Sequence, residues 1–169
     1  RCVEPSPFEQ AVLALSVRAW RESPFESLRL YPPVREGSCG GRLLLLSLAM
    51  DEEKRGEAGR AALAYEVLAE RYAGDDAAPG YEKKSVEALL KAGMEDQAFA
   101  RILLLEEKYG PGTKWAESHT PEVREKAQQE LVGMLKSISE RKFAEGVRSG
   151  ERKAMVAAKT GMERFFAAR

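Results

Sequence analysis

Two stretches of this chain, residues 56–72 and 93–109, share one spacing of small, large and apolar residues. Each begins with glycine, reaches alanine five positions later, and closes with glutamate, a basic residue and tyrosine. The matching apolar positions are Ala61, Tyr65 and Leu68 in the first copy and Ala98, Ile102 and Leu105 in the second. A looser third copy contains Ala154, Ala158, Gly161 and Glu163-Arg164-Phe165. Steps of three and four residues place such positions on one face of an α-helix, so the pattern predicts three helices with a buried stripe.

The recurrence of this stripe predicts an architecture as well as single helices. A helical pattern that recurs along a chain, as this one does from residues 56–72 to residues 93–109, is typical of stacked helix pairs. Good helix formers dominate the sequence, and no alternation of apolar and polar residues is long enough to predict a strand. We therefore predict an all-α fold, a short right-handed α-solenoid of about three helix pairs preceded by one or two N-terminal helices.

Start and stop signals divide the chain into two parts. Residues 1–41 are predicted to form N-terminal helices and a loop that pack on the solenoid, because Ser-Pro-Phe-Glu occurs at residues 6–9 and again at 23–26. Residues 42–169 are predicted to hold the repeats, as 42–73, 80–109 and 120–168. Thr120 and Pro121 mark the start of a long helix, which should end near residue 145 before a turn at 146–150.

Charge and hydropathy narrow the classes of function. The 27 basic and 27 acidic residues give a formal net charge of zero, and no surplus of positive charge points to nucleic acid. The most apolar run, residues 43–50, is far shorter than the roughly 20 residues that a membrane-spanning helix needs. The two cysteines, Cys2 and Cys39, either form a disulfide that ties the N-terminus to the 37–41 loop or stay unpaired. A disulfide would favour an oxidising compartment.

The sequence offers little catalytic chemistry. His119 is the only histidine, and neighbouring Glu117 and Ser118 are adjacent in sequence without being placed for catalysis, so we expect it exposed or beside a helix cap. One histidine and two distant cysteines are a poor supply of zinc ligands. The acidic residues 51–53 point in different directions on a helix. We predict no enzyme activity, no cofactor and no metal site.

The repeated spacing resembles the tetratricopeptide repeat, a helix pair of about 34 residues. Its second-helix pattern is similar to Gly56/Ala61/Tyr65 and Gly93/Ala98/Ile102, and Pro111 lies near the expected proline. The first-helix pattern is poorly kept, since Glu82, Ser85, Val86 and Leu89 stand at the matching positions of the second copy. In the third copy Ser149 occupies the place of the turn glycine, with Gly150 beside it. The resemblance covers about residues 42–169.

Two repeat endings also look like degenerate repeats of bacterial cell-envelope adaptors. These are Glu-Arg-Tyr-x-Gly-Asp-x-x-Ala-Pro and Lys-Tyr-Gly-Pro-Gly-x-x-Trp-Ala. Some such adaptors serve motility or assembly machineries. This resemblance implies a periplasmic or outer-membrane-associated protein, with the cytoplasm as the alternative.

The tetratricopeptide resemblance implies a concave face lined by the first helix of each pair. Carried over residue by residue, it predicts a groove lined by Leu46, Met50, Glu53, Lys83, Glu87, Leu90, Lys136, Ser139 and Phe143. A mixture of apolar and charged side chains of both signs suits a peptide or helix of another protein. Trp115, outside the repeats, either faces a partner or caps the gap between the second and third copies.

These features predict a non-enzymatic scaffold or adaptor that binds another protein. The alternative is a structural segment of a longer repeat array, stacked end to end on neighbouring repeats or on copies of itself, because Phe165-Phe166 extends an apolar face to the chain end. A helical-bundle enzyme is a third, less favoured interpretation, since no convergent set of titratable residues supports it.

Overall fold

The computed structural model describes residues 39–168 together with residues 11, 15, 18, 19 and 22. Within these residues every regular element is a helix and no strand occurs, so the all-α prediction is confirmed. The helices are α3 Cys39–Lys54, α4 Ala58–Arg71, α5 Ala78–Lys91, α6 Glu95–Tyr109, α7 Lys114–Ser118, α8 Pro121–Ser149 and α9 Arg152–Ala167. The predicted N-terminal helices and the Cys2–Cys39 disulfide lie outside the described residues, apart from the Cys39 backbone and five helical positions.

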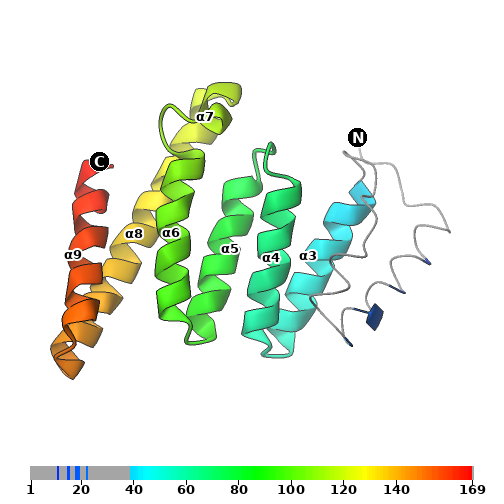
Figure 1. The fold of residues 1–169 in the computed structure, drawn as a ribbon. Helices are drawn as coiled ribbons and strands as arrows, with labels where there is room; N and C mark the ends of the chain where they lie inside the picture. Colours follow the sequence, from blue (N-terminus) through cyan, green and yellow to red (C-terminus); the bar gives the residue numbers. More distant parts are fainter. Residues whose placement is uncertain (1–10, 12–14, 16–17, 20–21, 23–38, 169) are drawn as a thin grey trace.

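Each long helix packs chiefly on its neighbours in the chain. Contacts join α3 to α4, α4 to α5, α5 to α6, α6 to α8, and α8 to α9, and α8 also reaches back to α5. Figure 1 shows the helices side by side in chain order, from α3 to α9 at the C-terminus. In the part of the chain described, every helix is either too short or too polar to cross a lipid bilayer.

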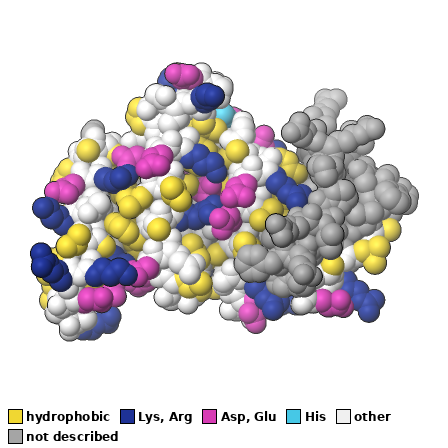
Figure 2. Space-filling view, in the orientation of Figure 1, with side chains coloured by type: hydrophobic (Ala, Val, Ile, Leu, Met, Phe, Trp, Pro, Cys, Tyr) yellow, Lys and Arg dark blue, Asp and Glu magenta, His cyan; other side chains and the backbone are white. Residues whose placement is uncertain are grey.

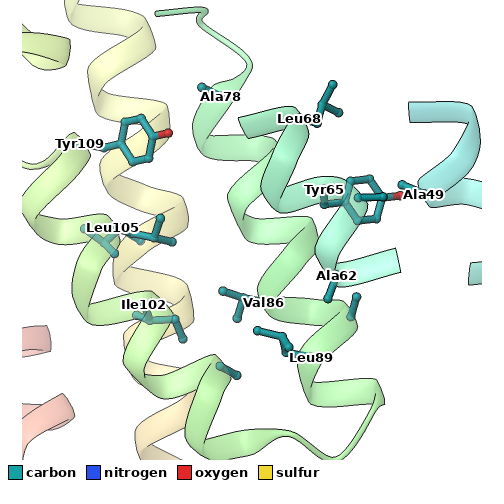
Figure 3. Close-up of a cluster of buried hydrophobic side chains, with 14 of the residues drawn as sticks. Ala49, Ala62, Tyr65, Leu68, Ala78, Val86, Leu89, Ile102, Leu105 and Tyr109 are labelled. Carbon is teal, nitrogen blue, oxygen red and sulfur yellow. The ribbon is translucent and has the colours of Figure 1, made fainter. Parts of the chain in front are cut away.

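The stripe predicted from the sequence forms the core between these helices. Ala61, Tyr65 and Leu68 of α4 are buried, as are Ala98, Ile102 and Leu105 of α6. Figure 3 shows Ile102 and Leu105 of α6 on the side toward α5, where Val86 lies, and Tyr109 farther along α6 at the level of Ala78. Burying a large apolar side chain contributes about 1.5–3 kcal/mol, which makes this stripe the main reason that the helices associate.

Glycines in the left-handed conformation end the first helix of each pair. Gly56 and Gly93 have φ of 79° and 73°. At each, two backbone bonds close the helix: Gly56 N–H donates to Glu53 at 3.1 Å and Glu57 N–H to Glu52 at 2.9 Å, and the Gly93 turn repeats the pattern. This is the Schellman motif, in which glycine is favoured because it lacks a Cβ. The two hairpins therefore have the same turn as well as the same stripe.

The third turn is shorter by one residue. Gly150 has φ of 72°, and its N–H makes a single bond to the Gly146 carbonyl at 2.9 Å, the simpler left-handed cap. The buried Ala154 therefore follows its turn glycine by four residues, where Ala61 and Ala98 follow theirs by five. The looseness of the third copy in sequence has this geometric cause.

Several predicted boundaries are wrong. Helix α3 begins at Cys39 rather than Arg42, so the end of the predicted 35–41 loop is helical. Helix α5 begins at Ala78 and holds Pro79 in its first turn. Proline has no backbone N–H to donate, and in the first turn of a helix that N–H would have no partner within the helix. Residues 114–118, which belong to none of the predicted repeats, form α7, which Thr113 caps by accepting a bond from Ala116 N–H at 3.2 Å. Helix α8 starts at Pro121 with Thr120 at its N-cap, as predicted, although the Thr120 side chain makes no cap bond; the helix continues to Ser149 and does not end near residue 145.

Polar side chains also pack between α4, α5 and α6. The four positions compared with the family's first-helix pattern, Glu82, Ser85, Val86 and Leu89, are all buried. Ser85 Oγ donates to the Ala62 carbonyl at 3.0 Å. Glu82 accepts bonds from Arg101 and Lys108 of α6, and Arg101 also binds Glu66 of α4. Polar groups at these positions are therefore bonded across the interface, as burial requires.

Candidate functional site

A hollow of about 530 Å³ lies where α5 and α8 diverge. Its α5 wall carries Lys83, Glu87 and Leu90 at helical spacing, Met134 of α8 adds apolar surface, and the buried side chains of Val86 and Ile102 also line it. Its α8 wall carries Lys126, Gln129, Glu130, Gly133 and Ser137. Apolar contact area with a few polar groups at the edge is the usual composition of a site that holds a ligand.

A second hollow of about 270 Å³ continues the first toward α3. The two hollows share Lys126 and Glu130, so they form one elongated groove along α8. Leu46 of α3, Pro79 of α5 and Val123 of α8 supply apolar surface at this end. On α8 the lining runs from Val123 to Ser137, about 21 Å at 1.5 Å per residue. We call this surface the α5–α8 groove.

Charges of both signs edge the α5–α8 groove. Lys83 of α5 and Glu130 of α8 approach to 3.9 Å across it. Lys126 is exposed between the two hollows, and Glu87 stands on the opposite wall. Figure 2 shows basic and acidic side chains mixed with hydrophobic ones on the face that it draws. The groove therefore offers apolar anchoring sites within an edge that can form ion pairs of either sign.

Four of the nine predicted groove residues line the α5–α8 groove. Lys83, Glu87 and Leu90 line the first hollow and Leu46 lines the second. Met50 is exposed on α3 but does not line either hollow. Lys136 and Phe143 are exposed on α8 outside the groove lining. Transferring the tetratricopeptide pattern residue by residue therefore identified the α5 wall of the groove but not the α8 wall.

Glu53 is held by its own chain. Its carboxylate accepts a bond from the Tyr65 hydroxyl at 3.0 Å and another from Lys91 Nζ at 3.2 Å. Although partial burial acts to raise it, these two bonds lower the pKa of Glu53 below its usual value. Burial and the bond to Glu53 raise the pKa of Tyr65. Glu53 therefore serves contacts among α3, α4 and α5.

Ser139 has to be removed from the predicted groove. The side chain is fully buried between α8 and α9, and its hydroxyl donates to the Leu135 carbonyl at 2.5 Å. Gly161 of α9 packs directly on it, because any Cβ at that position would collide with the Ser139 hydroxyl. The close approach of the two helices leaves no part of Ser139 for a partner.

The α8 residues that sequence reasoning missed share one helical face. Lys126, Gln129, Gly133 and Ser137 recur at steps of three and four along α8. The sequence contains this spacing, but α8 is 29 residues long. The shorter helices α3 and α5 therefore cannot be aligned with it to show which of its faces lines the groove. Only the packing of α8 against α5 identifies the face that lines the groove.

Gly133 is the least expected residue of that face. Glycine inside a helix costs about 1 kcal/mol relative to alanine. A Cβ added at Gly133 would meet nothing within 4 Å, so packing within the described chain does not require glycine there. The space above its backbone opens into the α5–α8 groove.

Trp115 is buried, and that leaves it unavailable to a partner in this structure. Its ring stacks on His119 with centroids 4.1 Å apart and meets the Tyr109 ring edge-on at 5.1 Å. The indole N–H points to the Asp75 carbonyl at 3.4 Å, and His119 Nε2 lies 3.1 Å from the Gly74 carbonyl. Helix α7 is thus bound to the end of α6 and to the loop that follows α4. His119, expected to be exposed or beside a helix cap, is the C-cap residue of α7, and its side chain is only 5% exposed.

A third hollow, of about 410 Å³, lies among α6, α8 and α9. Lys142 binds Asp96 at 2.7 Å and Glu145 at 2.8 Å, and Lys153 binds Asp96 at 2.8 Å. Burial acts to lower the pKa of Lys142, but these carboxylates raise it above its usual value. The charges of this hollow are matched within the chain, so they tie α6 to the last hairpin.

Among the described residues, no three or more His, Cys, Asp or Glu side chains are grouped to hold a metal ion. Comparisons of the chain with protein-family models, with curated proteins and with solved structures found no match. The function is therefore argued from the geometry of this chain alone.

Proposed function

We propose that this chain is a non-enzymatic scaffold that holds a peptide or helix of a partner protein in the α5–α8 groove. The observation that carries the proposal is the groove itself, an elongated hollow with apolar surface along its length and ion-pairing groups at its edge. A partner segment with apolar anchors and flanking charges would match it. We place this scaffold in a bacterial envelope assembly or motility complex, on the resemblance of its repeat endings alone.

The fold that supports this proposal is a short α-solenoid of tetratricopeptide-like hairpins. Its support comes from the equivalent turns at Gly56 and Gly93, the buried alanines five residues later, and packing that runs from each helix to the next. In stacked hairpins the first helices share one face. Two of these, α5 and α8, line the groove together, and α3 adds Leu46.

Gly133 gives the proposal a sharp test. Glycine at this position lets a partner backbone approach α8 closely, which would offset its cost to the helix. Peptides selected from a displayed random library on the purified chain should lose affinity about tenfold or more when Gly133→Leu fills the groove. The matched control is Ala100→Leu, which adds leucine at an exposed position of α6 outside the groove lining.

Comparing the two variants distinguishes a specific binding site in the groove from nonspecific peptide binding elsewhere on the surface. The proposal predicts that Ala100→Leu binds the selected peptides like the unmodified chain. Equal binding by Gly133→Leu would contradict the proposal, as would a failure to select any peptide that competes for one site. Circular dichroism of each variant shows whether the helices are retained.

The alternative function, a structural segment of a longer repeat array, is favoured by one observation. Phe166 of the last helix is 64% exposed and Met155 is 40% exposed, so α9 presents an apolar flank. In an array the following helix pair would cover that flank. Light scattering on this chain and on a longer polypeptide with further repeats would distinguish an array segment from a binding module.

A further inference from the structure

Exposed apolar side chains gather on the last hairpin. Among the described residues, five of the ten exposed large hydrophobic side chains lie on α8 and α9: Phe143, Val147, Met155, Val156 and Phe166. Apolar residues scattered singly need no explanation, but a concentration on one hairpin points to an interaction surface.

Two of these side chains, Met155 and Phe166, lie on one flank of α9. Val156, Ala157 and Thr160 face the third hollow, on the side of α6. Met155, Lys159, Met162 and Phe166 follow steps of four, three and four, so they form a separate stripe on the opposite flank. Met155 packs on Gly146 of α8, where a Cβ would lie 2.7 Å from its sulfur, and this contact places it near Val147 and Phe143. The flank therefore extends from α9 onto α8.

The order of residues along this flank is self-complementary. From N- to C-terminus it runs apolar, basic, acidic, apolar: Met155, Lys159, Glu163, Phe166. If a second α9 is laid antiparallel with its centre near Gly161, Met155 lies opposite Phe166 of the second copy. Lys159 then lies opposite Glu163 of the second copy, and each contact occurs twice by symmetry. In a parallel pairing Lys159 would instead face Lys159, which is unfavourable.

We propose that a second copy of this chain docks antiparallel on the Met155–Phe166 flank of α9 and forms a two-fold dimer. The surface is distinct from the α5–α8 groove, and the proposal does not depend on the groove binding anything. Lys159 and Glu163 form an exposed pair within one helix at 3.7 Å, so both charges can re-pair across the two-fold axis. Helix α9 has 16 residues and spans about 24 Å. A contact confined to one flank of a helix of that length is smaller than a standard interface, so we expect a weak, reversible dimer.

Sedimentation equilibrium of the 169-residue chain over a range of concentrations tests the proposal. We expect a reversible monomer–dimer equilibrium that Phe166→Glu weakens about tenfold or more. The control is Leu104→Glu, which places the same charge on an exposed leucine of α6 and should leave the equilibrium unchanged. A chain that stays monomeric at every concentration would overturn the proposal and leave a following repeat as the occupant of this flank. Equal weakening by both substitutions would overturn it as well.

Charge reversal tests the antiparallel arrangement. Lys159→Glu and Glu163→Lys should each weaken the dimer by roughly tenfold, because each creates two like-charge contacts. The double variant exchanges both charges and should restore dimerisation to near the unmodified level. A double variant as weak as the singles, with unchanged helix content by circular dichroism, would contradict the antiparallel dimer.

Discussion

The Glu82 carboxylate of α5 lies on the Arg101 guanidinium of α6, with one carboxylate oxygen 2.8 Å from Nε and 2.6 Å from Nη2. The second oxygen accepts a bond from Lys108 at 2.8 Å. Because Glu82 is only 1% exposed, its charge depends on these partners in place of water. Arg101 also binds Glu66, so the cluster links α4, α5 and α6.

Removing the arginine should therefore destabilise the fold strongly. Arg101→Met leaves the Glu82 charge buried with one cation, and breaking a buried pair costs about 3–5 kcal/mol. Urea denaturation should show a loss of roughly 3 kcal/mol in the free energy of unfolding. The control is Arg164→Met, which removes a more exposed pair with Glu106 and should cost less than about 1 kcal/mol. Similar losses in the two variants would show that the Glu82 cluster is no more than a surface pair.

Acid should remove a contribution from Asp96. Hydrogen bonds from Lys142 and Lys153 lower the pKa of Asp96 from 3.8 to about 2. A carboxyl whose pKa is depressed by folding stabilises the protein above its unfolded pKa, and this stability is lost as the pH falls through its folded pKa. The Asp96 side chain is 65% exposed, so solvent screening limits the contribution to less than about 1 kcal/mol.

Thermal unfolding of Asp96→Asn against the unmodified chain measures that contribution. The variant should be less stable near pH 6, and the difference should shrink between about pH 4 and pH 2. Lys153→Met removes one of the two hydrogen bonds to Asp96, so its loss of thermal stability near pH 6 should be smaller than that of Asp96→Asn. A difference that is constant with pH would contradict the assignment to this carboxylate.

The turn glycines should not tolerate a side chain. Gly93→Ala forces alanine into φ of 73° and should cost about 1 kcal/mol, although no atom lies within 4 Å of the added Cβ. Gly74→Ala has the same open surroundings without the positive φ and should be neutral or slightly stabilising. Chemical denaturation of the pair isolates backbone strain from packing, and equal effects would argue against the Schellman turn.

Two glycines of the last hairpin, one exposed on α8 and one buried on α9, should respond in opposite directions to alanine. Gly161→Ala should be destabilising by about 1–3 kcal/mol, because the new Cβ would collide with Ser139 and approach Phe99 at 3.2 Å. Gly133→Ala should be stabilising by roughly 0.5–1 kcal/mol, since helix propensity improves and nothing is displaced. Combining Gly161→Ala with Ser139→Ala should recover part of the loss. Unfolding temperatures that move together in the two single variants would contradict the helix packing described.

The sequence predicted the parts of the fold that repeat. Ala61 and Ala98 are buried and Gly56 and Gly93 form equivalent turns, because a stripe of small and large residues after a glycine has few other solutions. The same repeat pattern predicted the α5 wall of the groove, which Lys83, Glu87 and Leu90 line. Local spacing was sufficient wherever the two copies agree.

The parts that failed depend on contacts between distant segments. The groove positions predicted on α8, Lys136, Ser139 and Phe143, do not line it, because the rotation of this long helix is set by packing on α5 and α9. Ser139 is covered because Gly161 admits α9 so closely. Trp115 was left open between a partner-facing and a capping position, and its burial follows from contacts with Asp75 and Tyr109. No periodicity along the chain encodes these pairings.

The most direct test of the proposed scaffold is to map where a selected peptide binds by methyl chemical shifts. The account predicts that the methyl groups of Val86, Leu90 and Met134, which line the α5–α8 groove, shift on addition of the peptide. Met155 and Met162 of the α9 flank should keep their positions at a concentration where the chain is monomeric. Shifts confined to α9, or spread evenly over the molecule, would contradict a partner site in the α5–α8 groove.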